Sequence, residues 1–505
     1  MHLGQLLTAL CDSKKQLDRY AHLADREVTA ITNDSRLVKP GAMFVALTGY
    51  KTDGHHFIDD AVRRGATVLV CERPDVTVPD TVLRIVRPDA RRRLSSLADL
   101  WHGQPTRSLH LTGITGTNGK TTTAFRLWGL LEADGRPTGL LGTIEYRIGQ
   151  RRLPARNTTP GALPIQDLFR QMVDENLSHA VAEISSHALA LHRVDDVAFN
   201  IAVFTSLSDR EHLDFHKTPE NYFNAKARLF EMLPANGHAV VNLDDPLGQE
   251  IADRAPRTAH RVWFGLHPKP KLHVTAEALQ MDLSGTTYRL HTPQGQAPVR
   301  TPFIGRYNVL NDLAAAAAAY AAGLSLPAIV AGLHRPDPVP GRLERVPAPD
   351  LVAAVDYAHN ENALNSVLET VRAVAPRRLL LVFGAGGDRD KTKRGPMGAA
   401  AEKYADLIFL TADNSRSEQT TDILEQIQQG MTTTRPCRVI PDREMAIRAA
   451  VHAAQPGDCL LVAGKGHETY QILGDVTRPF DDRDVLRRAI AERETALQHT
   501  SQPEA

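Results

Sequence analysis

Gly113-Ile-Thr-Gly-Thr-Asn-Gly-Lys-Thr-Thr-Thr123 is the stretch from which the rest of the chain can be interpreted. The apolar run Leu109–Ile114 leads into it. Behind it, apolar side chains recur at helical spacing, at Ala124, Leu127, Trp128 and Leu131. This pattern predicts a strand, a glycine-rich loop and the start of a helix that ends by Gly135.

A loop of this kind is suited to binding phosphate. Glycines allow backbone N–H groups to turn toward phosphate oxygens, and the helix N-terminus adds the positive end of its dipole. Lys120 can reach the outer phosphates and Thr121 can ligate Mg²⁺. The alternative, a glycine-rich turn with an incidental lysine, leaves the flanking strand and helix unexplained. We therefore predict a nucleoside triphosphate site formed by Gly116, Thr117, Asn118, Gly119, Lys120, Thr121 and Thr122.

The loop is a variant of the common P-loop, which has four residues between its first glycine and the Gly-Lys pair. Here five residues separate Gly113 from Gly119, and only two separate Gly116 from Gly119. The strand-loop-helix order is nevertheless the same. The spacing alone therefore does not identify the protein class.

Composition limits what kind of protein this is. The chain has 505 residues, 42% of them hydrophobic and 23% charged, with 59 basic and 59 acidic residues. The length predicts several domains, and the balanced charge disfavours nucleic acid as a partner. The four cysteines form no CxxC pair, and no apolar run is long enough for a membrane span or signal peptide. We expect a cytoplasmic monomer without membrane insertion.

The order of expected elements predicts an α/β protein of three domains. Residues 1–105 mix short strands and helices, and residues 106–335 alternate strands with helices, which favours a mainly parallel sheet. Residues 336–505 carry buried strands followed by polar loops, typical of a Rossmann-like doubly wound sheet, at 352–355, 379–383, 407–410 and 459–462. The Gly384–Gly387 stretch lacks GxGxxG spacing, so NAD is not expected.

Further chemistry is expected where strands of the middle domain end. Glu183 closes an apolar strand, and a buried carboxylate needs a cation, for which Mg²⁺ is the natural choice beside phosphates. Asn157, Thr158 and Thr159 could hold a sugar or phosphate, or simply form a Thr-Pro turn. His212 and His216 could share a helix face, but no HExxH spacing or third soft ligand supports zinc.

The spelling TGTNGKTTT resembles the ATP loop of the Mur ligases and, less closely, that of folylpolyglutamate synthetases. Other stretches also resemble Mur ligase motifs, in chain order. They are DSR at 34–36, AEISSH at 182–187, EHLDFH at 211–216, YFNAK at 222–226, FIGRYN at 303–308, PGR at 340–342, VDYAH at 355–359, GGDRD at 386–390, DNSR at 413–416 and AGKGHE at 463–468. The resemblance is strongest to members that add the third peptide residue.

That resemblance implies an ATP-dependent amide ligase that adds meso-diaminopimelate to UDP-MurNAc-L-Ala-D-Glu through an acyl phosphate in peptidoglycan precursor synthesis. It implies a catalytic set of Lys120, Glu183, His212 and Lys226, the last three holding Mg²⁺ with Thr121, and Lys226 modified by CO₂ to a carbamate. Further nucleotide contacts are implied at Asn308, Arg342, Asp356 and His359.

The same resemblance implies two substrate-binding sets. The UDP-substrate set is Ser35, Asn157, Thr158, Thr159, Ser185 and Arg193, with the turn at residues 50–52. The amino-acid set is Arg389, Asp413, Asn414, Ser415, Arg416, Gly464 and Glu468. Arg416 is expected to bind the distal carboxylate of diaminopimelate, which L-lysine lacks.

Several positions depart from the family pattern: Leu191, Ser206, Asn360–Asn362, Ser415 and an additional residue in the segment 209–211. Because serine does not fix φ as proline does, Ser415 is expected to hold Arg416 less firmly. Three alternatives stay open: a ligase for L-lysine or another diamino acid, a folylpolyglutamate-synthetase-like ligase, and a non-catalytic paralogue that binds nucleotide or a partner enzyme.

Overall fold

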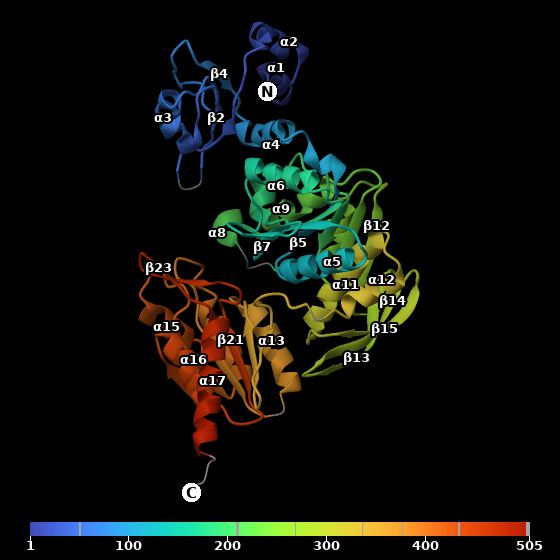
Figure 1. Cartoon of the computed structure of the whole chain (residues 1–505), viewed down its shortest axis with the longest axis vertical. Coiled ribbons are helices and arrows are strands. Elements are labelled where there is room, and N and C mark those ends of the chain that lie inside the picture. Colours follow the sequence, from blue (N-terminus) through green and yellow to red (C-terminus); the bar gives the residue numbers. More distant parts are fainter. Residues whose placement is uncertain are drawn as a thin grey trace. The chain divides into compact units, whose positions relative to one another are not determined.

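The structure is a computed structural model that describes residues 1–49, 52–208, 212–267, 269–335, 337–375, 377–432 and 435–500. It contains two compact units (Figure 1). The first comprises residues 1–264 and 314–324, and the second comprises residues 265–313 and 325–505. Across the described ranges, no helix is both long and apolar enough to cross a membrane.

The N-terminal part of the first unit is a small parallel sheet with helices on both faces. Its strands follow the order β1-β2-β3-β4, with bounds Ile31–Thr32, Met43–Ala46, Val68–Cys71 and Leu83–Val86. The helices are α1 (Leu3–Leu10), α2 (Lys14–Arg19), α3 (Ile58–Arg63) and α4 (Ala90–Trp101). Helices α1 and α4 bury their apolar stripes in one core, and α3 contributes to a second. Short 3₁₀ turns lie at 21–23, 35–37, 54–57 and 105–108.

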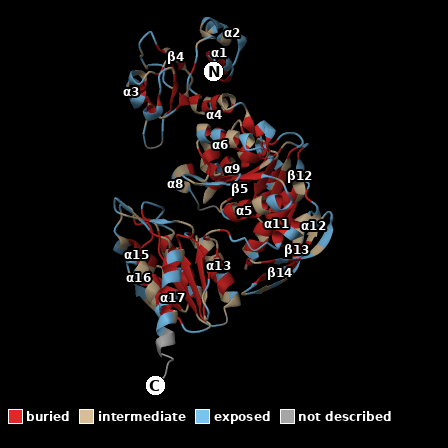
Figure 2. Ribbon diagram, viewed as in Figure 1, coloured by how far each residue is buried: buried red, intermediate tan, exposed pale blue. Residues whose placement is uncertain are grey.

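The larger part of the first unit is a mainly parallel sheet of order β12-β11-β10-β5-β9-β6-β7-β8, in which only β7 and β8 run antiparallel to their neighbours. The strands are β5 (His110–Thr115), β6 (Thr138–Leu141), β7 (Glu145–Ile148), β8 (Arg151–Pro154), β9 (His179–Glu183), β10 (Ile201–Phe204), β11 (His238–Asn242) and β12 (His260–Gly265). The helices are α5 (Lys120–Ala133), α6 (Ala162–Asp174), α7 (Ser186–Ala190), α8 (Leu213–His216), α9 (Pro219–Glu231) and α10 (Gly248–Asp253). Figure 2 shows the buried residues concentrated in the strands.

The second unit begins with three antiparallel strands, β13 (Val274–Asp282), β14 (Gly285–Thr292) and β15 (Gly295–Thr301), and α12 (Leu326–Leu333) packs on β15. Its main sheet has the order β16-β17-β21-β18-β19-β20, parallel except for β16. These strands are β16 (Glu344–Val346), β17 (Val352–Asp356), β18 (Leu379–Phe383), β19 (Leu407–Leu410), β20 (Cys437–Val439) and β21 (Cys459–Ala463).

Helices cover both faces of that main sheet, as expected for a doubly wound fold. One core contains residues of α13 (Glu361–Val374), α14 (Arg394–Tyr404) and α15 (Thr420–Gln428), and the other contains residues of α16 (Arg443–Ala453) and α17 (Asp482–Thr500). A hairpin of β22 (Tyr470–Leu473) and β23 (Val476–Pro479) follows β21. The strand predictions for this domain are therefore confirmed to within one residue at each end.

Two local predictions differ from the structure. The alanine-rich stretch Ala314–Ala322 predicts a helix that starts after the FIGRYN motif. The helix begins eight residues before Ala314, as α11 (Arg306–Ala321), so Asn308 lies in a helix and not ahead of one. The Asn308 side chain bonds the Ile304 carbonyl, which helps to close this first turn. The second difference concerns His212, which stands ahead of the short α8 with a φ of 58°. His212 and His216 therefore do not occupy successive turns of one helix.

Candidate active site

The glycine loop connects β5 to α5, as predicted, and neighbouring strand ends hold it in place. The Thr117 amide donates to the Ser206 carbonyl at 2.7 Å, and the Thr205 hydroxyl donates to the Asn118 carbonyl at 2.6 Å. Gly116 has a φ of 155°, and a Cβ built there would lie 1.9 Å from Thr205 Oγ1. Only glycine fits this position, because the loop lies directly against the end of β10.

Ser206, which departs from the family pattern, has a role in this arrangement. Its hydroxyl lies 3.1 Å from the Asn118 amide and 3.2 Å from the Asn118 carbonyl, so it can accept from one and donate to the other. A hydroxyl can serve as donor and acceptor together, as an amide side chain also can. A serine in place of an amide side chain therefore still supports the loop.

Lys120 and Thr121 begin α5 and point into the region in front of the loop. Lys120 Nζ donates to the carbonyls of Gly116 and Thr117, at 2.8 and 3.0 Å, so the ammonium curls back over the loop. The Thr121 hydroxyl donates to Glu183 Oε2 at 2.9 Å. This contact joins the loop to the end of β9, across neighbouring parallel strands.

Glu183 is almost completely buried, with 1% of its surface exposed. Besides Thr121, its carboxylate accepts from the Thr143 amide at 2.8 Å and the Thr143 hydroxyl at 3.0 Å. The Thr143 hydroxyl in turn lies 3.0 Å from that of Thr158. These donors satisfy the buried charge and hold the carboxylate beside the loop.

A cluster of rings lies beside the same loop. His187 stacks at a tilt on Phe215, and its centroid lies 5.0 Å from that of His212 and 5.4 Å from that of His216. Packing against neighbouring groups lowers the pKa of His212 to about 3, and the charges of His187, Lys120 and Lys226 act in the same direction, although residue 212 keeps solvent contact on one side. A neutral imidazole at this position is able to ligate a metal.

Lys226 lies on α9 and is also almost fully buried, with 1% exposure. Its Nζ lies 4.4 Å from the centre of the Tyr222 ring, and the Tyr222 hydroxyl lies 3.1 Å from Thr117 Oγ1 in the glycine loop. Burial, followed by the charges of His187 and Lys226, lowers the pKa of His216 to about 4. The lysine therefore faces the histidine cluster and the loop together.

Among the residues that the structure describes, no group of three or more His, Cys, Asp and Glu side chains is arranged to hold a metal ion by itself. The donors near the loop are a threonine hydroxyl, the Glu183 carboxylate and one imidazole. Such an oxygen-rich, incomplete set fits Mg²⁺, which usually retains waters and takes phosphate oxygens as further ligands.

Three residues predicted to bind the UDP-substrate lie together next to Glu183. The Thr159 hydroxyl donates to the Glu183 carbonyl at 2.7 Å and accepts from the Ser185 amide at 2.9 Å, while Arg193 Nη1 donates to the Thr159 carbonyl at 3.1 Å. Asn157 and Thr158 precede them, and Asn157 is exposed. Because both roles of the Thr159 hydroxyl are used internally, this residue orders the strand end.

Ser35 lies in the N-terminal part of the first unit and is buried. Its hydroxyl bonds Asp60, and that bond lowers the pKa of the Asp60 carboxyl. The adjacent Asp34 caps the following 3₁₀ turn through the Arg36 amide at 3.0 Å and forms an ion pair with Arg36. Of the turn predicted at 50–52, residues 50 and 51 lie outside the described ranges, as do residues 209–211.

Three of the residues predicted to contact the nucleotide, Arg342, Asp356 and His359, lie at the end of β17 and on the loops next to it. Asp356 closes β17 and accepts from the amides of Leu343 and Ala358, at 2.6 and 2.8 Å. Burial raises the pKa of Asp356, and the charge of Arg342 partly opposes that rise. The Arg342 guanidinium lies 4.7 Å from the Tyr357 ring centre. His359 follows, with Nδ1 2.9 Å from the Tyr357 carbonyl.

Asn360, another departure from the family pattern, has a clear local role. Its side chain accepts from the Ala363 amide at 2.8 Å and caps the N-terminus of α13. Asparagine and threonine are both good N-cap residues. The change therefore preserves the helix start.

Leu191, a further departure from the family pattern, follows the last residue of α7, and its amide bonds the His187 carbonyl.

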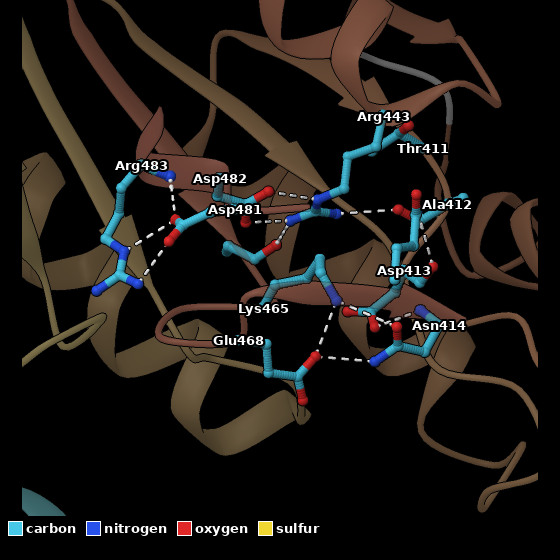
Figure 3. A network of polar contacts seen from close by, with 12 residues as sticks. Thr411, Ala412, Asp413, Asn414, Arg443, Lys465, Glu468, Asp481, Asp482 and Arg483 are labelled. Atoms are coloured by element: carbon cyan, nitrogen blue, oxygen red, sulfur yellow. Dashed lines mark hydrogen bonds and ion pairs between the residues drawn. The ribbon is translucent and has the colours of Figure 1, made fainter. Parts of the chain in front are cut away.

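Three members of the predicted amino-acid set, Asp413, Asn414 and Glu468, lie after the ends of β19 and β21 in one buried polar network (Figure 3). Asn414 Nδ2 donates to Glu468 Oε2 at 2.8 Å, and Lys465 Nζ donates to the same oxygen at 2.8 Å and to Asn414 Oδ1 at 3.1 Å. A Cβ at Gly464 would lie 2.7 Å from Asp413 Oδ2, and Gly464 has a φ of 115°. The carboxylate of Asp413 therefore lies directly over this glycine.

Arg416 and Arg389 lie near one another on the two neighbouring loops. A Cβ placed on Gly386 would be 3.1 Å from Arg416 Nη1 and 3.8 Å from Arg389 Cγ. Arg416 Nη1 donates to the Gly387 carbonyl at 2.7 Å, while Arg389 is exposed. The two neighbouring loops thus carry two guanidinium groups on one side of Gly386.

The loop that carries Arg416 has several supports in place of a proline. The Ser415 hydroxyl lies 2.6 Å from Thr420 Oγ1, and Asp388 accepts from the Ser417 hydroxyl at 2.6 Å. The β22–β23 hairpin pairs with the Arg416 backbone, where the Gly474 amide donates to the Arg416 carbonyl at 2.8 Å. A proline would hold this loop by restricting its own φ, and these contacts hold the loop in its place.

Sequence reasoning missed the residues beneath the amino-acid set. Lys465 and Gln471 are fully buried, and Gln471 Nε2 donates to the Asp413 carbonyl at 3.1 Å. Arg443 is also fully buried. Lys465 lies inside the AGKGHE stretch and could have been selected there. Gln471 and Arg443 lie outside every motif that we considered, and nothing in the sequence marks them.

Comparison with known proteins gives the class. Residues 27–102 match the catalytic domain of the Mur ligase family, residues 114–319 match the Mur ligase middle domain, and residues 341–466 match the Mur ligase glutamate ligase domain. The chain is 45% identical over 482 residues to the UDP-N-acetylmuramoyl-L-alanyl-D-glutamate–2,6-diaminopimelate ligase of Geobacillus kaustophilus, covering 94% of this chain and 96% of the relative. The chain belongs to the Mur ligase family.

Comparison with solved structures indicates the same family. A structure of a UDP-N-acetylmuramoyl-L-alanyl-D-glutamate–2,6-diaminopimelate ligase superposes with a TM-score of 0.70 at 32% identity and covers 98% of this chain and 99% of its own. A folylpolyglutamate synthase from Mycobacterium tuberculosis shares the fold alone, with a TM-score of 0.63 at 19% identity, covering 80% of this chain and 95% of its own. The three-domain α/β fold with parallel sheets is thus the Mur ligase fold, and family members use ATP.

Proposed function

We propose that this protein is an ATP-dependent ligase that adds meso-diaminopimelate to UDP-MurNAc-L-Ala-D-Glu in peptidoglycan precursor synthesis. The observation that carries the proposal is the amino-acid set at the ends of β19 and β21. There, Arg416 donates to the Gly387 and Asn414 carbonyls, the Asn414 side chain bonds Glu468, and Arg389 lies on the loop next to Arg416. A site with both guanidinium and carboxylate groups is suited to a zwitterionic end group. The similar proteins at 45% and 32% identity carry the matching activity in their names.

The reaction class is the one that the Mur ligase family implies. ATP phosphorylates the terminal side-chain carboxylate of the D-glutamate residue, and ADP leaves. An amino group of the incoming diamino acid then attacks the acyl carbon, forming the amide and releasing phosphate. Negative charge develops on the transferred phosphoryl group, so Lys120 at the helix start opposes it. The stretch 334–342 is rich in proline, which predicts a hinge between domains. Such a hinge would let the last domain exclude water from the acyl phosphate.

We propose that Thr121, Glu183 and His212 hold Mg²⁺, together with Lys226 in its carbamate form. Bound Mg²⁺ would neutralise phosphate charge. The chain's own residues support this by their chemistry: one hydroxyl, one buried carboxylate and one neutral imidazole border the loop. Lys226 is buried against Tyr222 and faces the histidines, where a carboxylate on a long side chain would suit a cation better than an ammonium would.

The two remaining substrate sets are proposals of the same kind. Asn308, Arg342, Asp356 and His359 would contact the nucleotide, and Ser35, Asn157, Thr158, Ser185 and Arg193 the UDP-substrate. Thr159 would act by ordering that strand end. We also propose domain limits of 1–105, 106–335 and 336–505, a monomeric protein, and a cytoplasmic reaction, since ATP is its substrate.

The test is phosphate release from ATP by the purified protein with UDP-MurNAc-L-Ala-D-Glu and one amino acid at a time. We expect turnover with meso-diaminopimelate and at least tenfold less with L-lysine or L-ornithine. A preference for L-lysine would contradict the proposed acceptor. Turnover with a folate and L-glutamate, without the UDP-substrate, would favour the synthetase alternative. Silence with every amino acid, under conditions where nucleotide binds, would favour the non-catalytic paralogue.

A further inference from the structure

Beneath the amino-acid set lies a fully buried ion pair between Arg443, the first residue of α16, and Asp482, the first residue of α17 (Figure 3). Both side chains have 0% exposure. Arg443 Nε donates to Asp482 Oδ1 and Nη2 donates to Oδ2, each at 2.7 Å. This is the bidentate geometry in which guanidinium and carboxylate match best.

The same guanidinium also bonds two backbone carbonyls on different strand ends. Nη1 donates to the Ala412 carbonyl at 3.1 Å, just after β19, and Nη2 donates to the Ala463 carbonyl at 2.9 Å, at the end of β21. Each carbonyl directly precedes a predicted amino-acid contact, Asp413 in one case and Gly464 in the other. One rigid group therefore fixes the points at which both loops leave the sheet.

Arg443 also acts on the charge of the site. Burial by itself raises the pKa of Asp413, but the charges of Arg443 and Lys465 outweigh burial and lower it. Asp413, Glu468, Asp481 and Asp482 are four carboxylates facing three cations, Arg443, Lys465 and Arg483, within this network. The network thus has one more carboxylate than it has cations, which suits an incoming ammonium group.

Stability alone is a weak explanation for this pair. Removing two charges from water costs several kcal/mol for each ion, and a well-packed apolar pair of similar volume is often as stable. What an apolar pair cannot provide is a donor to two separate carbonyls or a positive charge beside Asp413. We propose that Arg443, held by Asp482, is a positioning residue for the amino-acid substrate. This inference rests on the proposed function.

The substitutions Arg443→Lys and the double variant Arg443→Met with Asp482→Leu test the proposal. The double variant removes both members of the pair together, so neither Arg443 nor Asp482 is left without the other. Arg493→Lys is the matched control, because Arg493 forms a bidentate pair with Asp350 and bonds the Ala454 carbonyl in the same domain, away from these loops. For each protein, kcat and the KM of all three substrates are measured, together with Tm.

We expect the KM for meso-diaminopimelate to rise at least tenfold in the double variant and less in Arg443→Lys, whose single ammonium cannot span all three acceptors. The KM values for ATP and the UDP-substrate should stay within twofold. Arg493→Lys should leave every KM unchanged. A merely structural pair would lower Tm and active fraction without selecting one substrate, and that result would overturn the proposal.

A second measurement does not depend on the reaction. Amide hydrogen exchange should speed up in peptides covering 411–416 and 463–468 in the Arg443 variants and not in Arg493→Lys. Unchanged exchange there would overturn the positioning role even if the chain proved to use another acceptor. In one combination of results, the wild type is inactive with every amino acid while exchange in these two peptides still speeds up in the Arg443 variants. That combination would contradict the proposed function but not the role of Arg443 in positioning the two loops.

Discussion

The glycine loop of the first unit is held by backbone groups and hydroxyls, whereas the amino-acid set of the second unit is held by buried charges. Around the loop, the supports are the Thr205 and Ser206 side chains and the carbonyl of Ser206. Around Asp413 and Glu468, they are Arg443 and Lys465, both completely buried. Loss of one neutral hydrogen bond lowers the free energy of unfolding by about 1 kcal/mol, whereas a buried charge left without its partner lowers it by several kcal/mol.

This difference matches what each site is proposed to bind. A triphosphate brings its own large charge, so a loop that binds it needs backbone donors and one lysine close to the outer phosphates. An amino acid brings groups of both signs on one small molecule, so its site must place opposite charges at fixed separations. The predictions below test this comparison, beginning with the largest expected effect.

Replacing Lys226 by alanine should nearly abolish turnover. The residue is buried beside the loop, and in the proposed carbamate form it supplies a charge that alanine cannot. High concentrations of a small carboxylic acid should restore part of the activity, because the acid can occupy the space vacated by the side chain. Lys217→Ala, at an exposed lysine of the same unit, is the control. Full activity of Lys226→Ala in a phosphate-release assay would exclude the carbamate.

Replacing Lys120 by alanine should lower kcat by about 10²-fold or more, since it removes a charge aligned with the developing phosphoryl charge. The fold should persist, because the loop keeps its contacts with Thr205 and Ser206. The measurement is kcat at saturating ATP together with Tm. Near-normal turnover would mean that the nucleotide binds elsewhere.

These two sites differ in how much the sequence reveals. Lys120 and Thr121 directly follow the glycine loop in the sequence, so one contiguous stretch predicts their position. The strand and the helix predicted on either side of the loop are confirmed as β5 and α5. The second-unit strands were also predictable, because buried parallel strands are continuous apolar runs. Arg443 was not predictable, because its partners Ala412, Ala463 and Asp482 lie 31, 20 and 39 residues away.

Local competition explains the remaining differences. Alanine content indicates a helix but does not indicate where the helix begins. Helix α11 begins just after Gly305, where the Asn308 side chain bonds the Ile304 carbonyl. Ser415 was expected to weaken the loop of Arg416. The structure supplies a hydroxyl contact with Thr420 and a hairpin that no local pattern predicts.

Replacing Arg416 by alanine should reduce the preference for meso-diaminopimelate over L-lysine by about 10- to 150-fold, the range expected for one charge-assisted hydrogen bond of 1.5 to 3 kcal/mol. The loss should be selective, because L-lysine has no distal carboxylate. The measurement is kcat/KM for both amino acids. Arg435→Ala, at an arginine paired with Asp406 in the same unit, should leave the ratio unchanged. An unchanged ratio in Arg416→Ala would reject Arg416 as the selecting group.

The smallest expected effect separates the two units by pH. In the first unit, His110 and His179 begin neighbouring strands, with ring centroids 5.1 Å apart. Burial, followed by the charges of His110 and Arg136, lowers the pKa of His179 to about 4. In the second unit, the hydrogen bonds of Arg394 lower the pKa of Glu418 to about 2.

Both groups bind protons more weakly in the folded chain, so each favours folding at higher pH, but over different ranges. The contribution of neutral His179 is complete above its ordinary value of 6.5 and is lost as the pH falls toward 4. The contribution of ionised Glu418 is complete above 4.5 and is lost only as the pH falls toward 2. His179→Gln should therefore flatten the fall of Tm between pH 6.5 and 4, by a few degrees. Glu418→Gln should leave that range unchanged and flatten the fall below pH 4.5. If both variants changed the profile over the same range, the separation between the His179 range and the Glu418 range would be wrong.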